Sequence, residues 1–189
     1  MTIFEGEPLI GNRQHILNKG YAPNKIRTPA KAQFTSIWGW WYKHKAFFKK
    51  LADSGPYSVY GDWMYMQHGM HYDTLPDLFM TYDVYDYEVG KFLDVGLADT
   101  ILNKCGFSVV PLLHYGPTDS FEQLESWANG VTPYSSTHDK REGIYLKVCS
   151  DGYVIDRFKM VREEFEQGKF LSKTLLRNKV SLSVCKNYP

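Results

Sequence analysis

The pattern of apolar and polar positions is clearest near the end of the chain, where it predicts a strand hairpin. Apolar Ile144, Leu146 and Val148 alternate there with more polar residues, and this period of two is typical of a half-buried strand. The Asp151-Gly152 pair that follows is a favoured two-residue hairpin turn. Residues 153–160 are therefore predicted to return as the second strand.

This hairpin would carry charged side chains on neighbouring strands. Glu142 and Lys147 accompany the first strand, and Arg157 and Lys159 belong to the second. A carboxylate among cations is the arrangement that a site for metal-bound phosphates requires. Charges on the outer face of an ordinary hairpin are also commonly just solvated. The pattern alone leaves both interpretations open.

Periodicity elsewhere predicts an alternation of strands and helices along the chain. A short hairpin is expected over residues 1–12, and Gly, Pro and polar residues predict loops over 15–31 and 133–140. Predicted strands cover residues 57–65, 80–86 and 107–115, predicted helices cover 35–51, 91–105 and 120–128, and a partly helical stretch covers 163–180.

The predicted helix over residues 35–51 combines an apolar stripe with lysines. The stripe follows the three- and four-residue spacing of a buried helix face, and lysines occupy the other side. A basic and aromatic surface is suited to RNA phosphates, and a core helix with a solvated basic face explains the pattern as well. The stripe consists of Phe34, Ile37 or Trp38, Trp41, Phe48 and Leu51, and the lysines are Lys43, Lys45, Lys49 and Lys50.

Composition bounds the class of protein. The chain has 189 residues, 43% of them hydrophobic, which is enough for one globular domain with its own core; a single domain over residues 1–189 is expected. The net charge of +1 does not by itself indicate a nucleic-acid partner. The cysteines are odd in number and widely spaced, which disfavours a disulfide framework and fits a reducing, cytoplasmic setting. No apolar run is long enough for a membrane span.

The charged hairpin resembles a known family. Residues 142–147, Glu-Gly-Ile-Tyr-Leu-Lys, and residues 157–162, Arg-Phe-Lys-Met-Val-Arg, are similar to the last two nucleotidyltransferase motifs of ATP-dependent RNA ligases. The branch that the chain most resembles is that of RNA ligase 2. Arg157 stands where many relatives have Lys, so the charge is kept but its geometry is not equivalent.

The middle of the chain extends the resemblance. The family has a strand that ends in Gly-Glu followed by an apolar or aromatic residue, where the acid binds the ribose hydroxyls; Asp62 takes that place here, one methylene shorter. The resemblance implies that Tyr82 stacks on adenine, a contact of about 1–3 kcal/mol for bases on protein aromatics. The matching residues follow in order as Gly61-Asp62-Trp63, His68, Tyr72, Leu75-Pro76, Phe79 and Tyr82-Asp83-Val84.

A third group lies near the start of the chain. Gly11-Asn12-Arg13 stands where these ligases carry a small residue followed by Asn and Arg. By this resemblance Arg13 approaches the nucleotide or its phosphates. An ordinary surface position explains Arg13 equally well.

The resemblance implies an α+β nucleotidyltransferase fold of RNA and DNA ligases, in which antiparallel sheets flanked by helices form an ATP-grasp-like cleft. ATP and Mg²⁺ are the implied cofactors, and RNA ends are the implied substrate. Glu142 would place the metal. Lys147, Arg157 and Lys159 would neutralise the α-phosphate and the leaving pyrophosphate. Lys159, Glu142 and Lys147 are the implied catalytic residues, and nucleotide binding would involve Arg13, Asp62, Tyr82, Glu142, Lys147, Arg157 and Lys159.

One family motif is missing. The family's nucleophile is the Lys of a Lys-x-Asp-Gly motif, which attacks the α-phosphate of ATP, and this motif does not occur in the sequence. We therefore expect a chain that is N-terminally truncated relative to the family, as a fragment or a degenerate relative. Two functions remain: an RNA ligase-type adenylyltransferase that joins or repairs RNA ends, and a non-catalytic module that binds nucleotide or RNA.

Overall fold

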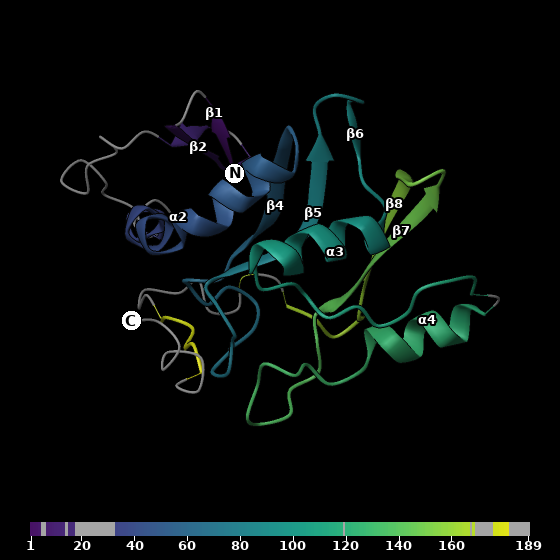
Figure 1. Ribbon diagram of the computed structural model, residues 1–189. Helices are drawn as coiled ribbons and strands as arrows, with labels where there is room; N and C mark the ends of the chain where they lie inside the picture. The colour runs from purple at the N-terminus through teal and green to yellow at the C-terminus, as the bar shows by residue number, and fades with distance from the viewer. Residues whose placement is uncertain are drawn as a thin grey trace. The chain divides into compact units, whose positions relative to one another are not determined.

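The computed structural model describes residues 1–4, 7–13, 15–17, 33–118, 120–166, 168 and 176–181. The described residues form helices and small antiparallel sheets (Figure 1), as the sequence predicts at this coarse level. The chain divides into two compact units, each made of two segments: residues 1–61 with 81–109, and residues 62–80 with 110–189. A single domain over residues 1–189 stays a prediction.

The first unit begins with a three-stranded antiparallel sheet. β1 (Thr2–Phe4) pairs with β2 (Glu7–Gly11), and β2 pairs with β3 (Ile16–Leu17). The predicted N-terminal hairpin is confirmed in its two strands, and Ile10 is fully buried. The prediction of a loop from residue 15 was wrong for β3, a two-residue strand too short to show a period. Residues 18–31 of that predicted loop lie outside the described residues.

Helix α2 (Ile37–Ser54) supplies much of the apolar core of this unit. Each of its buried aliphatic and aromatic side chains contributes about 1.5–3 kcal/mol relative to exposure. Phe48 meets Phe107 edge to face, with ring centroids 5.1 Å apart. The helix buries Ile37, Trp40, Trp41, His44, Phe48 and Leu51.

The four lysines of α2 are all exposed. At 3.6 residues per turn, Lys43 and Lys50 fall on one flank of the buried face, and Lys45 and Lys49 fall on the other. They therefore form two pairs rather than one basic side. The ammonium nitrogen of Lys49 also lies 2.9 Å from a carboxylate oxygen of Asp53, one helical turn later.

Helix α3 (Val95–Cys105) starts later than the apolar pattern predicts. The carboxylate of Asp94 accepts a hydrogen bond from the amide of Leu97 at 2.8 Å and caps the helix. Because the cap residue has non-helical backbone, the prediction of a helix from residue 91 was wrong. Residues 91–92 instead form β6 (Lys91–Phe92). The predicted end is confirmed, since Gly106 has the left-handed φ of 98° typical of a helix stop.

Strands β4 (Tyr57–Trp63), β5 (Phe79–Asp86) and β6 form a second sheet in that order. The predicted strands of this region are confirmed. The prediction of a buried strand over residues 107–115 was wrong, since only Val109 makes a bridge there, to Thr81. Pro111 has no amide hydrogen to continue a ladder, and residues 111–117 are exposed.

The second unit contains α4 (Phe121–Ala128) and the hairpin of β7 (Gly143–Ser150) and β8 (Tyr153–Val161). The predicted hairpin is confirmed. Asp151 and Gly152 have φ of 54° and 83°, as a type I′ turn requires. The hydroxyl of Ser120 accepts a hydrogen bond from the amide of Gln123 and caps α4.

The stretch predicted to be partly helical has no helix in its described residues. Residues 163–164 form a turn, and residues 176–181, yellow in Figure 1, contain two isolated bridge positions. Arg177 bridges Met66, and Val180 bridges Leu75. Residues 169–175 lie outside the described part of the chain. Among the described helices, none has the length and apolar content needed to cross a membrane.

Candidate functional site: a charged hairpin beside two tyrosines

The register of the hairpin places three cations on one face. Lys147 is directly opposite Arg157, and Tyr145 is directly opposite Lys159. Residues that face each other across strands, or lie two apart along one strand, share a face of the sheet. The ammonium nitrogen of Lys147 also lies 5.6 Å from the centroid of the Tyr145 ring. We call Lys147, Arg157 and Lys159 the cationic face.

Glu142 joins this face through an ion pair with Lys159. Glu142 stands one residue before β7, and its carbonyl oxygen accepts a hydrogen bond from the amide of Arg162 at 3.0 Å. Gly143 permits the close approach of the strands here. A Cβ at Gly143 would overlap the carbonyl oxygen of Met160 and lie 2.8 Å from the Cα of Val161. The Glu-Gly pair thus brings a carboxylate against a lysine on β8.

The hairpin is less regular than the alternation predicts. Val148 is 45% exposed although the pattern places it inside, and Cys149 is half-buried. The cause is a register shift between these two residues, since an extra residue in one strand interrupts the alternation of faces. The shift lies after Lys147, so it leaves the pairing of the cationic face intact.

Tyr72 lies within electrostatic range of Glu142 and of Asp62. Burial, followed by the negative charges of Glu142 and Asp62, raises the pKa of Tyr72 to about 12. The ring of Tyr134 lies edge-on to it, with centroids 6.5 Å apart, and burial raises the pKa of Tyr134 as well. Two carboxylates 80 residues apart in sequence therefore lie within electrostatic range of one protonated phenol.

Arg13 and Tyr82 belong to the first unit, whereas the other five predicted site residues belong to the second. Arg13 is exposed in the turn between β2 and β3, where the amide of His15 donates to the side chain of Asn12 at 2.8 Å. Tyr82 is half-buried on β5. The structure thus brings together Asp62, Glu142, Lys147, Arg157 and Lys159 in one unit.

Comparison with known proteins decides the family. The family model for RNA ligase matches residues 1–161, a range that runs from the start of the chain to the last residue of β8. The chain belongs to the RNA ligase family. No curated protein and no solved structure gives a significant match.

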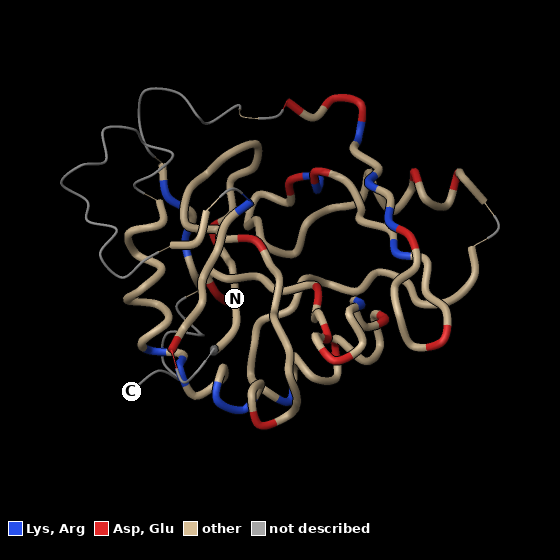
Figure 2. Tube along the Cα trace, turned by 90° about the horizontal axis from the view of Figure 1, so that it is seen from above, with Lys and Arg blue, Asp and Glu red and all other residues tan. Residues whose placement is uncertain are grey.

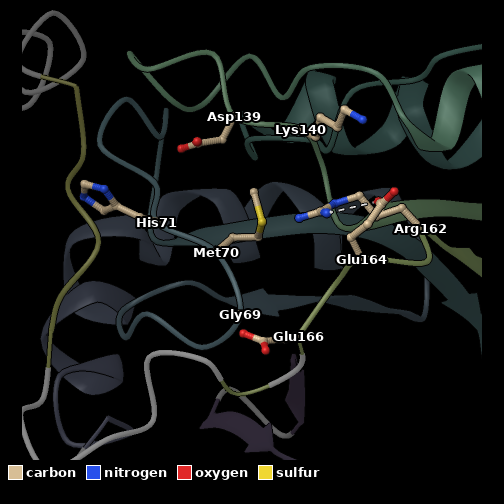
Figure 3. A pocket seen from close by; sticks show the side chains of 8 residues that line it. All are labelled: Gly69, Met70, His71, Asp139, Lys140, Arg162, Glu164 and Glu166. Atoms are coloured by element: carbon tan, nitrogen blue, oxygen red, sulfur yellow. Dashed lines mark ion pairs between the residues drawn. The ribbon is translucent and has the colours of Figure 1, made fainter.

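This RNA ligase family member has a separate pocket beyond the end of β8, shown in Figure 3. The cavity is about 150 Å³ in volume, and none of the seven predicted site residues lines it. Arg162 lines this pocket, and its Nη1 lies 3.6 Å from Oε2 of Glu164. Its Nε donates a 2.9 Å hydrogen bond to the carbonyl oxygen of Arg141. The lining residues are Gly69, Met70, His71, Asp139, Lys140, Arg162, Glu164 and Glu166.

Charges of both signs are interspersed along the trace (Figure 2), in keeping with a net charge of +1. A phosphate site in this ligase family member must therefore be local, as the cationic face is. Among the described residues, no three His, Cys, Asp or Glu side chains gather closely enough to hold a metal ion by themselves.

Sequence reasoning assigned no role to Tyr72 or Tyr134. Tyr72 did appear in the family order, between His68 and Leu75. Glu142 is 70 residues away from Tyr72 in sequence, so no local pattern signals that the two lie near each other. Tyr134 stands in a polar loop and carries no motif.

Proposed function

We propose that this chain is an RNA ligase-type adenylyltransferase, which binds ATP and joins or repairs RNA ends by nucleotidyl transfer. The observation that carries the proposal is the cationic face with its Glu142–Lys159 ion pair. Three cations on one face of a paired hairpin suit a triphosphate, because the strand pairing holds them on the same side and they can neutralise the charge that develops during phosphoryl transfer.

Within this proposal each cation has a role. Lys147 and Arg157 hold non-bridging phosphate oxygens from opposite strands. Lys159 exchanges its ion pair with Glu142 for a contact with the α-phosphate. The nucleophile attacks this phosphate, and pyrophosphate departs from it. Two or three charged contacts of this kind are each worth about 1.5–3 kcal/mol.

The remaining predicted residues would hold the nucleoside. Asp62 would bind the ribose hydroxyls, Arg13 would approach the ribose or phosphates, and Tyr82 would stack on adenine. Tyr72 would keep its proton beside Asp62 and Glu142, because its pKa of about 12 leaves the phenol a hydrogen-bond donor at neutral pH.

Mg²⁺ fits the donors that are present. It is usually held by one or two carboxylates together with phosphate oxygens, rather than by an all-protein cage. Glu142 provides a carboxylate beside the cationic face, and Asp62 provides a second near Tyr72. When bound, the metal would supply Lewis-acid stabilisation of the phosphate oxygens.

The test is incubation of the purified chain with α-³²P-ATP and Mg²⁺, followed by a denaturing gel. Lysyl-AMP formation joins a lysine nitrogen to the α-phosphorus and breaks its bond to the bridging oxygen, releasing pyrophosphate. We expect an acid-labile, hydroxylamine-sensitive label on the protein, lost in Glu142→Gln and Lys159→Gln but kept in Lys104→Gln, which removes an exposed lysine of α3.

The Lys-x-Asp-Gly motif does not occur in this sequence, so a label requires a different lysine as the acceptor. Absence of label with retained ATP binding would replace the transferase proposal with the alternative of a nucleotide-binding module. Absence of both would overturn the assignment of the site.

A further inference from the structure

Two aromatic rings and an arginine form a stepped surface where β4 ends. The rings of Trp63 and Tyr65 are nearly parallel, with centroids 6.2 Å apart and an interplanar angle of 10°. The guanidinium carbon of Arg177 lies 4.9 Å from the centroid of the Tyr65 ring. Both aromatic residues are partly exposed and Arg177 is exposed. We call Trp63, Tyr65 and Arg177 the stacking surface.

Buried Asn178 fixes the backbone on both sides of Tyr65. Its side-chain nitrogen donates to the carbonyls of Met64 and Met66, at 2.9 and 3.1 Å. Its side-chain oxygen accepts from the amide of Tyr72 at 3.0 Å. All three of these hydrogen bonds join the Asn178 side chain to backbone groups. The stacking surface is therefore ordered before any ligand binds, which lowers the entropic cost of binding.

Arg177 is fixed by its own backbone as well. It bridges Met66, and its carbonyl oxygen accepts a 3.0 Å hydrogen bond from the side chain of Gln67. Its side chain makes no part of these bonds. A substitution at Arg177 therefore changes the surface while the backbone contacts that dock residues 176–181 remain available.

The chemistry of this surface suits a nucleobase. Unpaired bases of any sequence stack on aromatic side chains and on the planar group of arginine. The positive charge of an arginine also attracts phosphate groups. Trp63 directly follows Asp62, which shares the electrostatic surroundings of Tyr72 with Glu142. The stacking surface and the cationic face belong to the same unit of the structure.

We propose that the stacking surface binds an unpaired base near the end of an RNA strand. The inference rests on the proposed function for the class of ligand, RNA. None of its three residues is among those assigned to ATP, so the two proposals can fail separately. If the stack serves only to pack residues 176–181 against residues 64–67, it has no effect on RNA binding in a folded protein.

Fluorescence anisotropy with a 5′-labelled, unstructured 12-nucleotide RNA tests the proposal, with the corresponding duplex as a second ligand. Arg177→Gln is compared with Lys179→Gln, which removes the same charge from an exposed position of the same segment. Arg177→Lys keeps the charge without the planar group. Tyr65→Leu removes the central ring, and Trp127→Leu on α4 removes an aromatic ring outside the surface.

We expect single-stranded RNA to bind more tightly than the duplex. Arg177→Gln and Tyr65→Leu should weaken single-strand binding by about five-fold to 100-fold, Arg177→Lys should resemble Arg177→Gln, and Lys179→Gln and Trp127→Leu should change it less than three-fold. The loss in Arg177→Gln should persist at high salt, because stacking does not depend on counterion release.

Equal effects of Arg177→Gln and Lys179→Gln that disappear at high salt would overturn the proposal, because they would reduce Arg177 to a general positive charge. Absence of RNA binding by the wild-type chain would overturn it too. ATP binding measured in parallel separates the two proposals. If the wild-type chain does not bind ATP but its RNA binding is weakened by Arg177→Gln and Tyr65→Leu, the nucleotide site alone is refuted. If the chain binds ATP and its RNA binding is unchanged by Arg177→Gln and Tyr65→Leu, the stacking surface alone is refuted.

Discussion

At Tyr72, burial and two carboxylates act in the same direction on one phenol. Its pKa of about 12 compares with an ordinary value of 10.0, and burial is the largest cause, followed by Glu142 and Asp62. The sequence places Tyr72 in the family order, yet it does not reveal that residues 62 and 142 lie near it. A raised pKa means that the folded chain holds this proton more tightly than the unfolded chain does.

This shift predicts a specific alkaline instability. Below pH 10 the phenol of Tyr72 is protonated in both states, and its contribution to stability is fully present. Between pH 10 and 12 the unfolded chain loses the proton first, so stability falls. Denaturant unfolding at pH 9 and pH 11 should show an additional loss of about 1.4 kcal/mol in wild type relative to Tyr72→Phe. Glu142→Gln should reduce this additional loss; identical profiles for wild type and Tyr72→Phe would contradict the described surroundings.

Among the elements, the charged hairpin was the best predicted and helix boundaries were less so. Its alternation and its Asp151-Gly152 turn are local signals, and both strands follow from them. The register shift after Val148 is not local, because it depends on how β8 pairs. The apolar residues before Asp94 extended the predicted helix past the residue that caps it. Pro111 limits the strand that the apolar run suggested.

Gly143 tests the packing of this hairpin. In Gly143→Ala the new methyl group would overlap the Met160 carbonyl, so β7 and β8 must separate and Glu142 must move from Lys159. We expect a loss of about 1–3 kcal/mol in the free energy of unfolding, as overpacking typically costs, measured by urea titration.

Gly39→Ala is the matched control for this substitution. A Cβ at Gly39 meets nothing within 4 Å, and Gly39 is an exposed position of α2. Alanine there should stabilise the chain by about 0.5 kcal/mol, because glycine loses more backbone freedom in a helix. A Gly143→Ala protein as stable as the Gly39→Ala protein would show that the strands do not approach as described.

On the scale of the whole molecule, the family and the mixed helix and sheet content follow from the sequence, and the matched range of residues 1–161 covers most of the chain. The predicted site residues divide between the two units. Arg13 and Tyr82 belong to one, and the other contains Asp62, Glu142, Lys147, Arg157 and Lys159. Motif order reports which residues a family uses. It does not report that Glu142 acts electrostatically on Tyr72, since the two are brought near each other only when distant segments fold together.

The central claim is that the cationic face binds the phosphates of ATP, and calorimetric titration tests it most directly. Wild type, the double variant Lys147→Gln/Lys159→Gln and the control Lys104→Gln are titrated with ATP and with adenosine in the presence of Mg²⁺. The account predicts that wild type binds ATP at least about ten-fold more tightly than adenosine, that the double variant loses this preference, and that Lys104→Gln keeps it. An unchanged preference for ATP in the folded double variant would contradict the assignment of the phosphates to this hairpin.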